Sequence, residues 1–161
     1  MCECKGKMNR DDVIGELKRY FDVRELVCPH TYRKFGDESW KVFDGDFLKT
    51  ILILRRDVLN KPMIVNTWHE GGRYSQRGYR CNICQIPRGK TLKGVSYISA
   101  HCLAKAIDFD VRGMEVFEVH KVIEQNIDMF FTKIRMEKGV SWNHLDIYHE
   151  PDNPKFYEFN P

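Results

Sequence analysis

The chain has 161 residues, of which 42% are hydrophobic and 12% aromatic, a composition typical of a globular protein and not of a disordered one. Its formal net charge of +3 at pH 7 permits attraction to an anionic polymer, a cell wall or a nucleic acid, without requiring either. No segment approaches the roughly 20 apolar residues that a membrane-spanning helix needs, and the first residues lack the apolar region of a secretory signal. We therefore expect one domain over residues 1–161, with residues 1–10 disordered, made in the cytoplasm and not inserted in a membrane.

The first half of the chain predicts mainly helices. Residues 11–20 predict a short helix, whereas residues 21–40 mix aromatic and turn-forming residues and predict irregular structure. Asp44 is the expected N-cap of a longer helix over residues 46–59, whose apolar positions form a wide stripe. A turn that contains proline ends this helix, and residues 63–65 predict a short buried strand.

The second half begins with a long polar, glycine-rich segment, residues 67–93. Loops of this length inside a compact domain are usually functional. The remaining elements are expected as a strand, a helix and two strands, over residues 104–111, 114–126, 130–136 and 143–148. The segment after His149 is expected to lie over the surface. Helices followed by strands, with one helix inserted, predict an α+β fold with a small, mainly antiparallel sheet flanked by helices.

The cysteines allow two interpretations. They are Cys2, Cys4, Cys28, Cys81, Cys84 and Cys102. Without an export signal, most are expected to be reduced thiols. Cys81 and Cys84 have the spacing of half a structural zinc site, with Cys2 and Cys4 as the other half. The alternative, which we prefer, is that Cys81 and Cys84 are two surface thiols on a loop. No special role is expected for His30, His69, His120 and His149.

Two segments carry residues that are typical of a metal site. His101 and Asp108 are seven residues apart and flanked by small residues, and His144 lies in the strand expected at residues 143–148, where polar side chains share one face. Two imidazoles and one carboxylate form the ligand set of a catalytic zinc site with an open fourth position. Taken singly, a lone histidine usually has another partner, Asp108 is explained by a turn or a salt bridge, and Asp110 is an equal candidate. The joint pattern favours a metal site.

These two segments match the motifs of a known family. The first motif, Ser-x-His-x-x-Gly-x-Ala-x-Asp, stands here as Ser99, His101, Ala104, Ala106 and Asp108, and the second, Trp-x-His, as Trp142 and His144. With these motifs the chain resembles the peptidase M15 group, the zinc D-Ala-D-Ala carboxypeptidases and phage cell-wall peptidases that share a fold with the hedgehog signalling domain. The resemblance covers residues 21–148 and implies a hedgehog-like fold and a Zn²⁺ cofactor held by His101, Asp108 and His144. Ala104 replaces the family's glycine, a mild change if the backbone there does not need a positive φ.

The chain departs from the family at the catalytic acid or base. Family members generally have a Glu or Asp five or six residues before the last zinc histidine, and those positions are Gly139 and Lys138 here. Glu137, seven residues before His144, would reach the site across a turn that is one residue longer; otherwise it is a solvated hairpin carboxylate. Asp146 is the alternative, either as the base or as a partner that orients an imidazole.

The polar segment after the first expected strand supplies candidates for substrate binding. The resemblance implies an arginine there, often followed by glutamine, that binds the substrate carboxylate, and the candidates are Arg73 with Gln76, or Arg77. A guanidinium suits this task because it grips a carboxylate through two parallel hydrogen bonds. The alternative for any one of Arg73, Arg77 and Arg80 is a solvated basic loop, although at least one of the three is expected to be functional. Ser99 either binds substrate or braces the loop, or it only caps a turn.

The resemblance predicts a zinc metallopeptidase that cleaves peptidoglycan stem peptides by activating water, as a D-Ala-D-Ala carboxypeptidase or an L-Ala-D-Glu-type endopeptidase. Such an enzyme is expected to be a monomer, to act on the cell wall as a phage or prophage lysis enzyme (an endolysin), and to bind no nucleic acid. One alternative is a non-catalytic zinc-binding relative of the same fold. A zinc-organised nucleic-acid enzyme is the weaker alternative, because His69, Glu70 and Arg80 depart from the deaminase pattern around the Cys81 pair.

Overall fold

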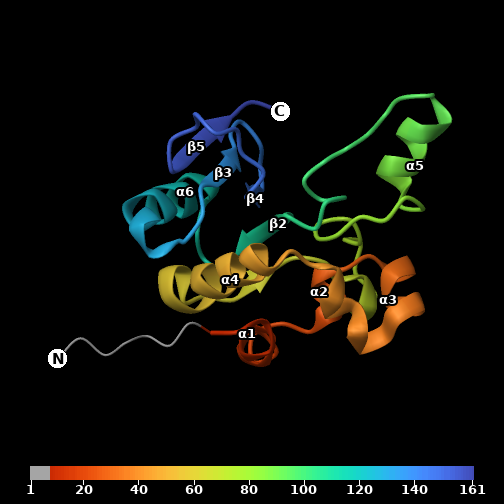
Figure 1. Ribbon diagram of the computed structural model, residues 1–161, viewed down its shortest axis with the longest axis horizontal. Helices are drawn as coiled ribbons and strands as arrows, with labels where there is room; N and C mark the ends of the chain where they lie inside the picture. Colours follow the sequence, from red (N-terminus) through yellow and green to blue (C-terminus); the bar gives the residue numbers. More distant parts are fainter. Residues whose placement is uncertain (1–7) are drawn as a thin grey trace.

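The structure of the protein is a computed structural model that describes residues 8–161 (Figure 1). The helices are α1 (Arg10–Leu17), α2 (Val23–Leu26), α3 (Pro29–Phe35), α4 (Gly45–Leu52), α5 (Gln85–Leu92) and α6 (Val116–Gln125). The strands are β1 (Met63–Ile64), β2 (Ala106–Val111), β3 (Ile134–Glu137), β4 (Asn143–Asp146) and β5 (Phe156–Phe159). The described residues thus form an α+β domain. Within residues 8–161, none of the helices combines the length and the apolar character that crossing a bilayer requires.

Helix α1 begins at a capping box. The side chain of Asn9 accepts a hydrogen bond from the N–H of Asp12, and the Asp12 carboxylate accepts one from the N–H of Asn9. Of the expected disordered residues 1–10, residues 1–7 lie outside the described part of the chain. Asn9 and Arg10 are ordered as the start of this helix, so the expectation is wrong for them.

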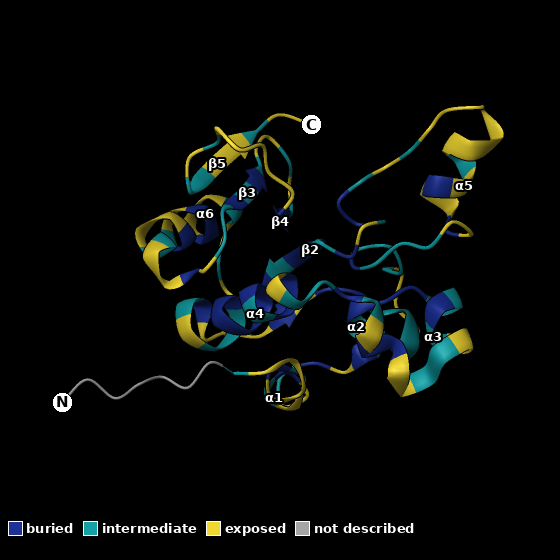
Figure 2. Ribbon diagram, in the orientation of Figure 1, coloured by how far each residue is buried: buried dark blue, intermediate teal, exposed yellow. Residues whose placement is uncertain are grey.

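Helix α4 and its π-helical continuation, Ile53–Leu59, confirm the long helix expected over residues 46–59. Asp44 is its N-cap, as expected, and accepts hydrogen bonds from the N–H groups of Asp46 and Phe47. The apolar stripe of this helix is buried in the main hydrophobic core, which also takes in the inner faces of α1, α6 and the sheet. Burial of this stripe accounts for the dark blue of α4 in Figure 2.

Residues 21–40 are not irregular, and this expectation is corrected. They form α2, α3 and a 3₁₀ segment, Gly36–Val42. Asp22 and Glu25 make a second capping box for α2, and Pro29 occupies the first turn of α3, where its missing N–H costs nothing. The polar and proline residues that suggest turns are therefore helix starts.

Two further segments are more regular than expected. The polar segment of residues 67–93 contains α5, in which Pro87 falls in the first turn. This helix stands away from the sheet and is mostly exposed (Figures 1 and 2). The segment after His149 does not only lie over the surface, because it forms β5, which pairs parallel to β3.

The five strands form one mixed sheet in the order β1-β2-β4-β3-β5. The pairs β1–β2, β2–β4 and β4–β3 are antiparallel, as the sequence predicts, and β3–β5 is parallel. Side chains alternate across this sheet. Apolar residues such as Ile107, Met136 and Leu145 belong to the core, so polar neighbours such as Asp108 and His144 share the opposite face. We call this the polar face of the sheet.

Candidate metal centre

Three residues that the sequence predicts as metal ligands meet on the polar face. Asp108 of β2 lies directly opposite His144 of β4 because the two strands pair in that register. His101 reaches the same point from the turn before β2, where the Ser99 hydroxyl accepts a hydrogen bond of 3.3 Å from the N–H of Cys102. The exposed fractions of His101, Asp108 and His144 are 4%, 7% and 7%, so all three are buried.

The potential ligand atoms are close enough to share one metal ion. His144 Nδ1 lies 2.7 Å from Asp108 Oδ1, and His101 Nε2 lies 3.3 Å from the same oxygen. One such atom from each residue lies within 4.8 Å of the other two. The ring centroids of His101 and His144 are 5.1 Å apart, with the ring planes inclined by 60°. We call these three residues the histidine–aspartate cluster.

Hydrogen bonds on the outer side of each histidine fix its orientation. His101 Nδ1 lies 2.8 Å from the carbonyl oxygen of Gly78, and it carries a proton because a carbonyl oxygen only accepts. His144 Nε2 donates to Asp146 Oδ2 over 2.7 Å. When both rings are neutral, His101 Nε2 and His144 Nδ1 therefore keep the lone pairs that face Asp108, as in metal sites whose histidines have second hydrogen-bond partners.

Burial and neighbouring charges set the protonation of this cluster. Burial raises the pKa of Asp108, but its contacts with the imidazoles of His101 and His144 outweigh burial and the pKa is lowered. Burial lowers the pKa of His144, but its hydrogen bonds to Asp108 and Asp146 raise it to about 9. Burial also lowers the pKa of His101. At neutral pH, Asp108 is therefore anionic, His144 cationic and His101 neutral, so a bound cation would have to displace one proton.

Asp146 is placed to orient His144. It is fully buried and accepts hydrogen bonds from Arg135 Nε (3.0 Å) and Nη2 (3.1 Å), from the N–H of Tyr148 (3.0 Å) and from His144 Nε2. These four bonds use the acceptor capacity of the carboxylate. Of the two roles expected for Asp146, this geometry fits the orienting role and leaves no lone pair directed at a water in the site.

We expect Asp146→Asn to weaken zinc binding at the histidine–aspartate cluster by about 10- to 100-fold, the usual effect of losing such an outer partner. The substitution keeps the shape of the side chain but removes the charge that favours a metal-ligating imidazole. A competition titration against a chromophoric chelator measures the affinity, with the exposed Asp152→Asn as control. An affinity within twofold of the unmodified protein would show that Asp146 does not support the ligand.

A cavity of about 370 Å³ opens beside the cluster. Besides His101, Asp108 and His144, it is lined by Arg80, Tyr97, Ile98, Ser99, Ala100, Arg135, Glu137, Trp142, Asp146, Tyr148 and Phe159. Glu137 lies on β3, and continuing the register in which Arg135 faces Asp146 places Glu137 opposite His144. Among residues 8–161, the Glu137 carboxylate has no hydrogen-bond or ion-pair partner. Asp108, His144 and Glu137 thus form one cross-strand row on β2, β4 and β3.

The arginines of the polar segment are not placed as the sequence predicts. Arg77 forms an ion pair of 2.6 Å with Asp110, and Arg73 donates to the Tyr74 hydroxyl, so neither lines the cavity. Gln76 also lies outside it, with its side-chain oxygen accepting from the N–H of Ile86. The pairing with Arg77 also removes Asp110 as an alternative ligand, because Asp110 is not part of the cluster.

Arg80 is the arginine that reaches the cavity from this segment. Its Nη2 donates to Asp108 Oδ2 over 3.0 Å, and within residues 8–161 its Nη1 has only a long contact of 3.5 Å to the Tyr97 hydroxyl. Arg80 follows Arg77 by three residues in the same basic run, so the sequence indicated the run but not the residue. Ser99 caps the turn and also lines the cavity, which leaves both of its expected roles open.

Ala104 lies in a strained backbone conformation. Its φ is +57°, in the left-handed region. This conformation costs a non-glycine residue about 1–2 kcal/mol. The position therefore needs a positive φ, so alanine here, where the motif that the chain resembles has glycine, is strained and not a mild change.

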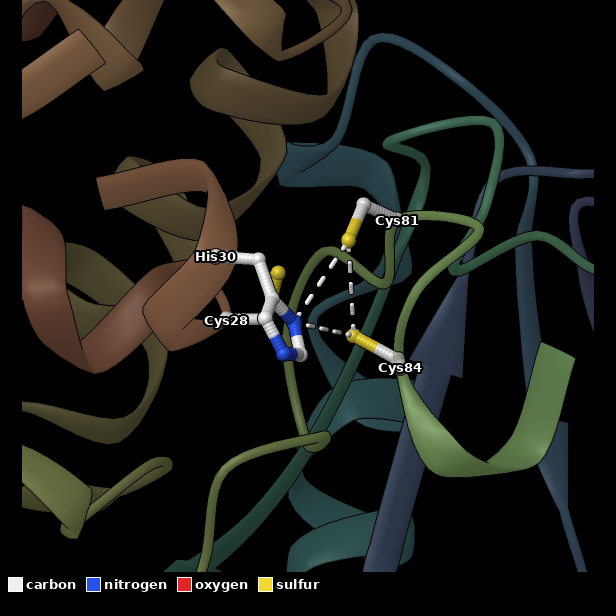
Figure 3. A group of neighbouring side chains, drawn as sticks. All are labelled: Cys28, His30, Cys81 and Cys84. Atoms are coloured by element: carbon white, nitrogen blue, oxygen red, sulfur yellow. Dashed lines mark hydrogen bonds between the residues drawn. The ribbon is translucent and has the colours of Figure 1, made fainter. Parts of the chain in front are cut away.

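A second group of potential ligands consists of Cys28, His30, Cys81 and Cys84 (Figure 3). The preferred interpretation of Cys81 and Cys84 as surface thiols is wrong, because Cys84 is buried and Cys81 half-buried. Their partners are Cys28 and His30, to which no role was assigned; Cys2 and Cys4 lie outside the described residues. The sequence feature that would have indicated this group is a Cys-x-His pair more than fifty residues before the Cys-x-x-Cys pair. We call these four residues the cysteine cluster.

The two clusters are joined through Gly78. Its carbonyl oxygen accepts from His101, and the next residue, Tyr79, forms a parallel bridge to Val27, beside Cys28. A Cβ atom on Gly78 would lie 2.0 Å from the carbonyl oxygen of Leu26. Only glycine therefore allows the two backbone segments to approach this closely.

We expect Gly78→Ala to lower the free energy of unfolding by about 3 kcal/mol or more, because the clash is with backbone that cannot rotate away. Gly89→Ala is the matched control, since a Cβ there meets nothing within 4 Å. In the middle of α5 that change should be neutral or stabilising by up to about 1 kcal/mol. Equilibrium unfolding in urea measures both variants. An effect of Gly78→Ala below about 0.5 kcal/mol, within the range of ordinary surface substitutions, would contradict the close approach.

The fold and the histidine–aspartate cluster together define a class: an α+β domain with a candidate metal centre on one face of a mixed sheet. Comparison of the chain with protein-family models, with curated proteins and with solved structures finds no match in any of the three. What the protein does is therefore inferred from the chemistry of its own residues.

Proposed function

We propose that this chain is a zinc-dependent hydrolase that cleaves peptide bonds in peptidoglycan stem peptides. The observation that carries the proposal is the cross-strand row of Asp108, His144 and Glu137 beside one cavity. It combines potential metal ligands with a carboxylate that has no other partner among the described residues. Hydrolysis of an amide needs both a Lewis acid and a group that moves protons.

The donor set of the histidine–aspartate cluster fits zinc. Tetrahedral zinc with bonds of about 2.0–2.2 Å separates its N and O ligands by about 3.3–3.5 Å, and His101 Nε2 and Asp108 Oδ1 are 3.3 Å apart. The 2.7 Å contact between His144 and Asp108 would have to open by about 0.6 Å to fit the same geometry. Three protein ligands leave a fourth position open, where bound zinc supplies a Lewis acid and lowers the pKa of water.

Glu137 and two neighbours of the row, Asp146 and Arg80, then have defined tasks. Glu137 accepts a proton from the attacking water and later delivers it to the leaving amine, which requires only that one carboxylate faces the cavity. Asp146 holds His144 in the orientation that presents Nδ1. Arg80, through the Nη1 that has only its long contact to Tyr97, binds a substrate carboxylate at the cavity wall.

The choice of substrate is supported by the motifs and by charge. The motifs around Ser99 and Trp142 resemble those of cell-wall peptidases. The α+β fold with a mainly antiparallel sheet is the coarse architecture on which such a site would be built. A net charge of +3 suits an anionic cell-wall polymer. The carboxylate of Glu137, which has no partner in the part of the chain that the structure describes, favours this function over a non-catalytic zinc-binding relative.

Digestion of purified peptidoglycan by the zinc-loaded protein tests the proposal. Mass spectrometry of the released muropeptides should show a new product, and its mass distinguishes loss of a terminal D-Ala from cleavage of an internal bond such as L-Ala-D-Glu. The same reaction with His144→Ala protein should yield none. If the zinc-loaded protein releases no product from any muropeptide, the peptidase function is wrong and the non-catalytic alternative stands.

A further inference from the structure

We propose that Cys28, His30, Cys81 and Cys84 bind a structural zinc ion, separate from the histidine–aspartate cluster. The four side chains converge on one point (Figure 3), with Cys28 and His30 at the start of α3 and Cys81 and Cys84 in the loop before α5. One potential ligand atom from each residue lies within 4.8 Å of the other three. The site does not depend on any enzymatic activity of the protein.

The spacing of the ligand atoms matches a zinc tetrahedron. With Zn–S bonds of about 2.3 Å and Zn–N bonds of about 2.0–2.1 Å, tetrahedral geometry separates two sulfurs by about 3.8 Å and a sulfur from a nitrogen by about 3.6 Å. Cys81 Sγ and Cys84 Sγ are 3.8 Å apart. His30 Nδ1 is 3.6 Å from Cys81 Sγ and 3.7 Å from Cys84 Sγ. Four ligand atoms have six pairwise distances, and these three agree with those expected around zinc to within about 0.1 Å.

The chemistry of the donors favours a thiophilic metal such as zinc over the hard cations. Three thiolates and one imidazole are soft ligands that favour zinc over magnesium or calcium. Four protein ligands close the coordination sphere, which is the mark of a structural site and not a catalytic one. A disulfide does not explain the cluster, since the sulfurs of Cys81 and Cys84 are 3.8 Å apart and a disulfide bond is about 2.05 Å long.

The backbone prepares this site from two segments that are distant in sequence. Tyr79 donates its N–H to the carbonyl oxygen of Leu26 over 2.8 Å, which holds the two segments side by side just before their ligands. The N–H of Cys84 donates to the carbonyl oxygen of Cys81 over 3.1 Å, so the Cys-x-x-Cys pair forms a tight turn. Pro29 fixes the start of α3 between the other two ligands.

A zinc ion here would clamp the start of a helix that has little other support. Helix α5 buries only Pro87, so the hydrophobic core does little to hold this helix against the loop that precedes it. This loop carries Gly78 and Arg80, which contact His101 and Asp108. The zinc would therefore stiffen the side of the histidine–aspartate cluster that is built from loop residues and not from the sheet.

Metal analysis with cobalt spectroscopy tests the proposal on the full chain. We expect about two zinc ions per chain, falling to about one in Cys84→Ser and in His144→Ala. In the cobalt-loaded protein, thiolate-to-metal charge-transfer absorption should persist in His144→Ala, be lost in Cys84→Ser, and remain in the control Cys102→Ser, whose sulfur lies outside the cluster. Charge-transfer absorption reports on the metal ligands and not on activity. The result therefore tests the cysteine cluster whether or not the protein is a peptidase.

A thiol-blocking mercurial added to the unmodified protein covers the case in which Cys84→Ser does not fold. It should release about one zinc ion, detected with a metallochromic dye, and the same amount from His144→Ala. Absence of charge-transfer absorption in the cobalt-loaded protein, or release of no zinc after complete thiol blocking, would overturn the proposal.

Discussion

Glu137→Gln should lower peptidase activity by about 10²- to 10⁴-fold, the usual contribution of a positioned acid or base, and leave the zinc content unchanged. Glutamine has nearly the same shape but cannot accept the proton of the attacking water. Rates of muropeptide cleavage measure the effect, with zinc determined on the same samples. The retained zinc separates loss of the proton acceptor from loss of the metal.

Glu124→Gln is the matched control for this experiment, because Glu124 is exposed on α6 and lines no part of the cavity. It should cleave at the unmodified rate. If Glu137→Gln keeps full activity and Asp146→Asn is equally active, neither carboxylate moves the proton, and the assignment of Glu137 is wrong.

Cys84→Ser should lower the melting temperature by about 8–16 °C. A ligand present at about 1,000 times its dissociation constant stabilises the folded state by about 4 kcal/mol, and in a chain of this size each kcal/mol shifts the melting temperature by about 2–4 °C. Thermal unfolding followed by circular dichroism in zinc-containing buffer measures the change. The ion clamps α3 to the loop before α5, so its loss frees both segments.

Chelation provides the internal check on this prediction. A strong chelator removes zinc from both clusters, so it should lower the melting temperature of the unmodified protein at least as far as Cys84→Ser does. Cys102→Ser in zinc should melt within about 2 °C of the unmodified protein, as expected for a substitution that changes stability by about 0.5 kcal/mol or less. If the chelator leaves the melting temperature unchanged although zinc is removed, the ion has no structural role at the cysteine cluster.

The position of Glu137 beside the metal centre can be predicted from the sequence only in part. The residue type and the short hairpin are visible in the sequence, but counting from His144 left it one residue beyond the family's spacing. The strand register decides the matter, because Arg135 faces Asp146 and Glu137 therefore falls opposite His144. The register of two paired strands depends on which face of each strand packs against the core. It therefore follows from packing and not from counting residues along the chain.

The cysteine cluster, and the choice of Arg80 among the three arginines of the loop, cannot be predicted from the sequence for a different reason. The ligands of the cluster come from two segments that meet only because Gly78 allows close backbone contact with Leu26. Nothing local in either segment indicates that contact. Likewise, Arg77 and Arg80 are equivalent in sequence, and they differ only because Arg77 pairs with Asp110 outside the cavity. By contrast, α4 and the antiparallel strands follow from capping and periodicity and were predicted correctly.

Anomalous diffraction at the zinc absorption edge, from crystals of the zinc-loaded protein, would show directly whether His101, Asp108 and His144 hold zinc. We expect a peak about 2.0–2.2 Å from His101 Nε2, Asp108 and His144 Nδ1, beside Glu137, and a second peak inside the cysteine cluster. A peak at the cysteine cluster alone, with none at the histidine–aspartate cluster, would contradict the claim that His101, Asp108 and His144 form a catalytic zinc centre.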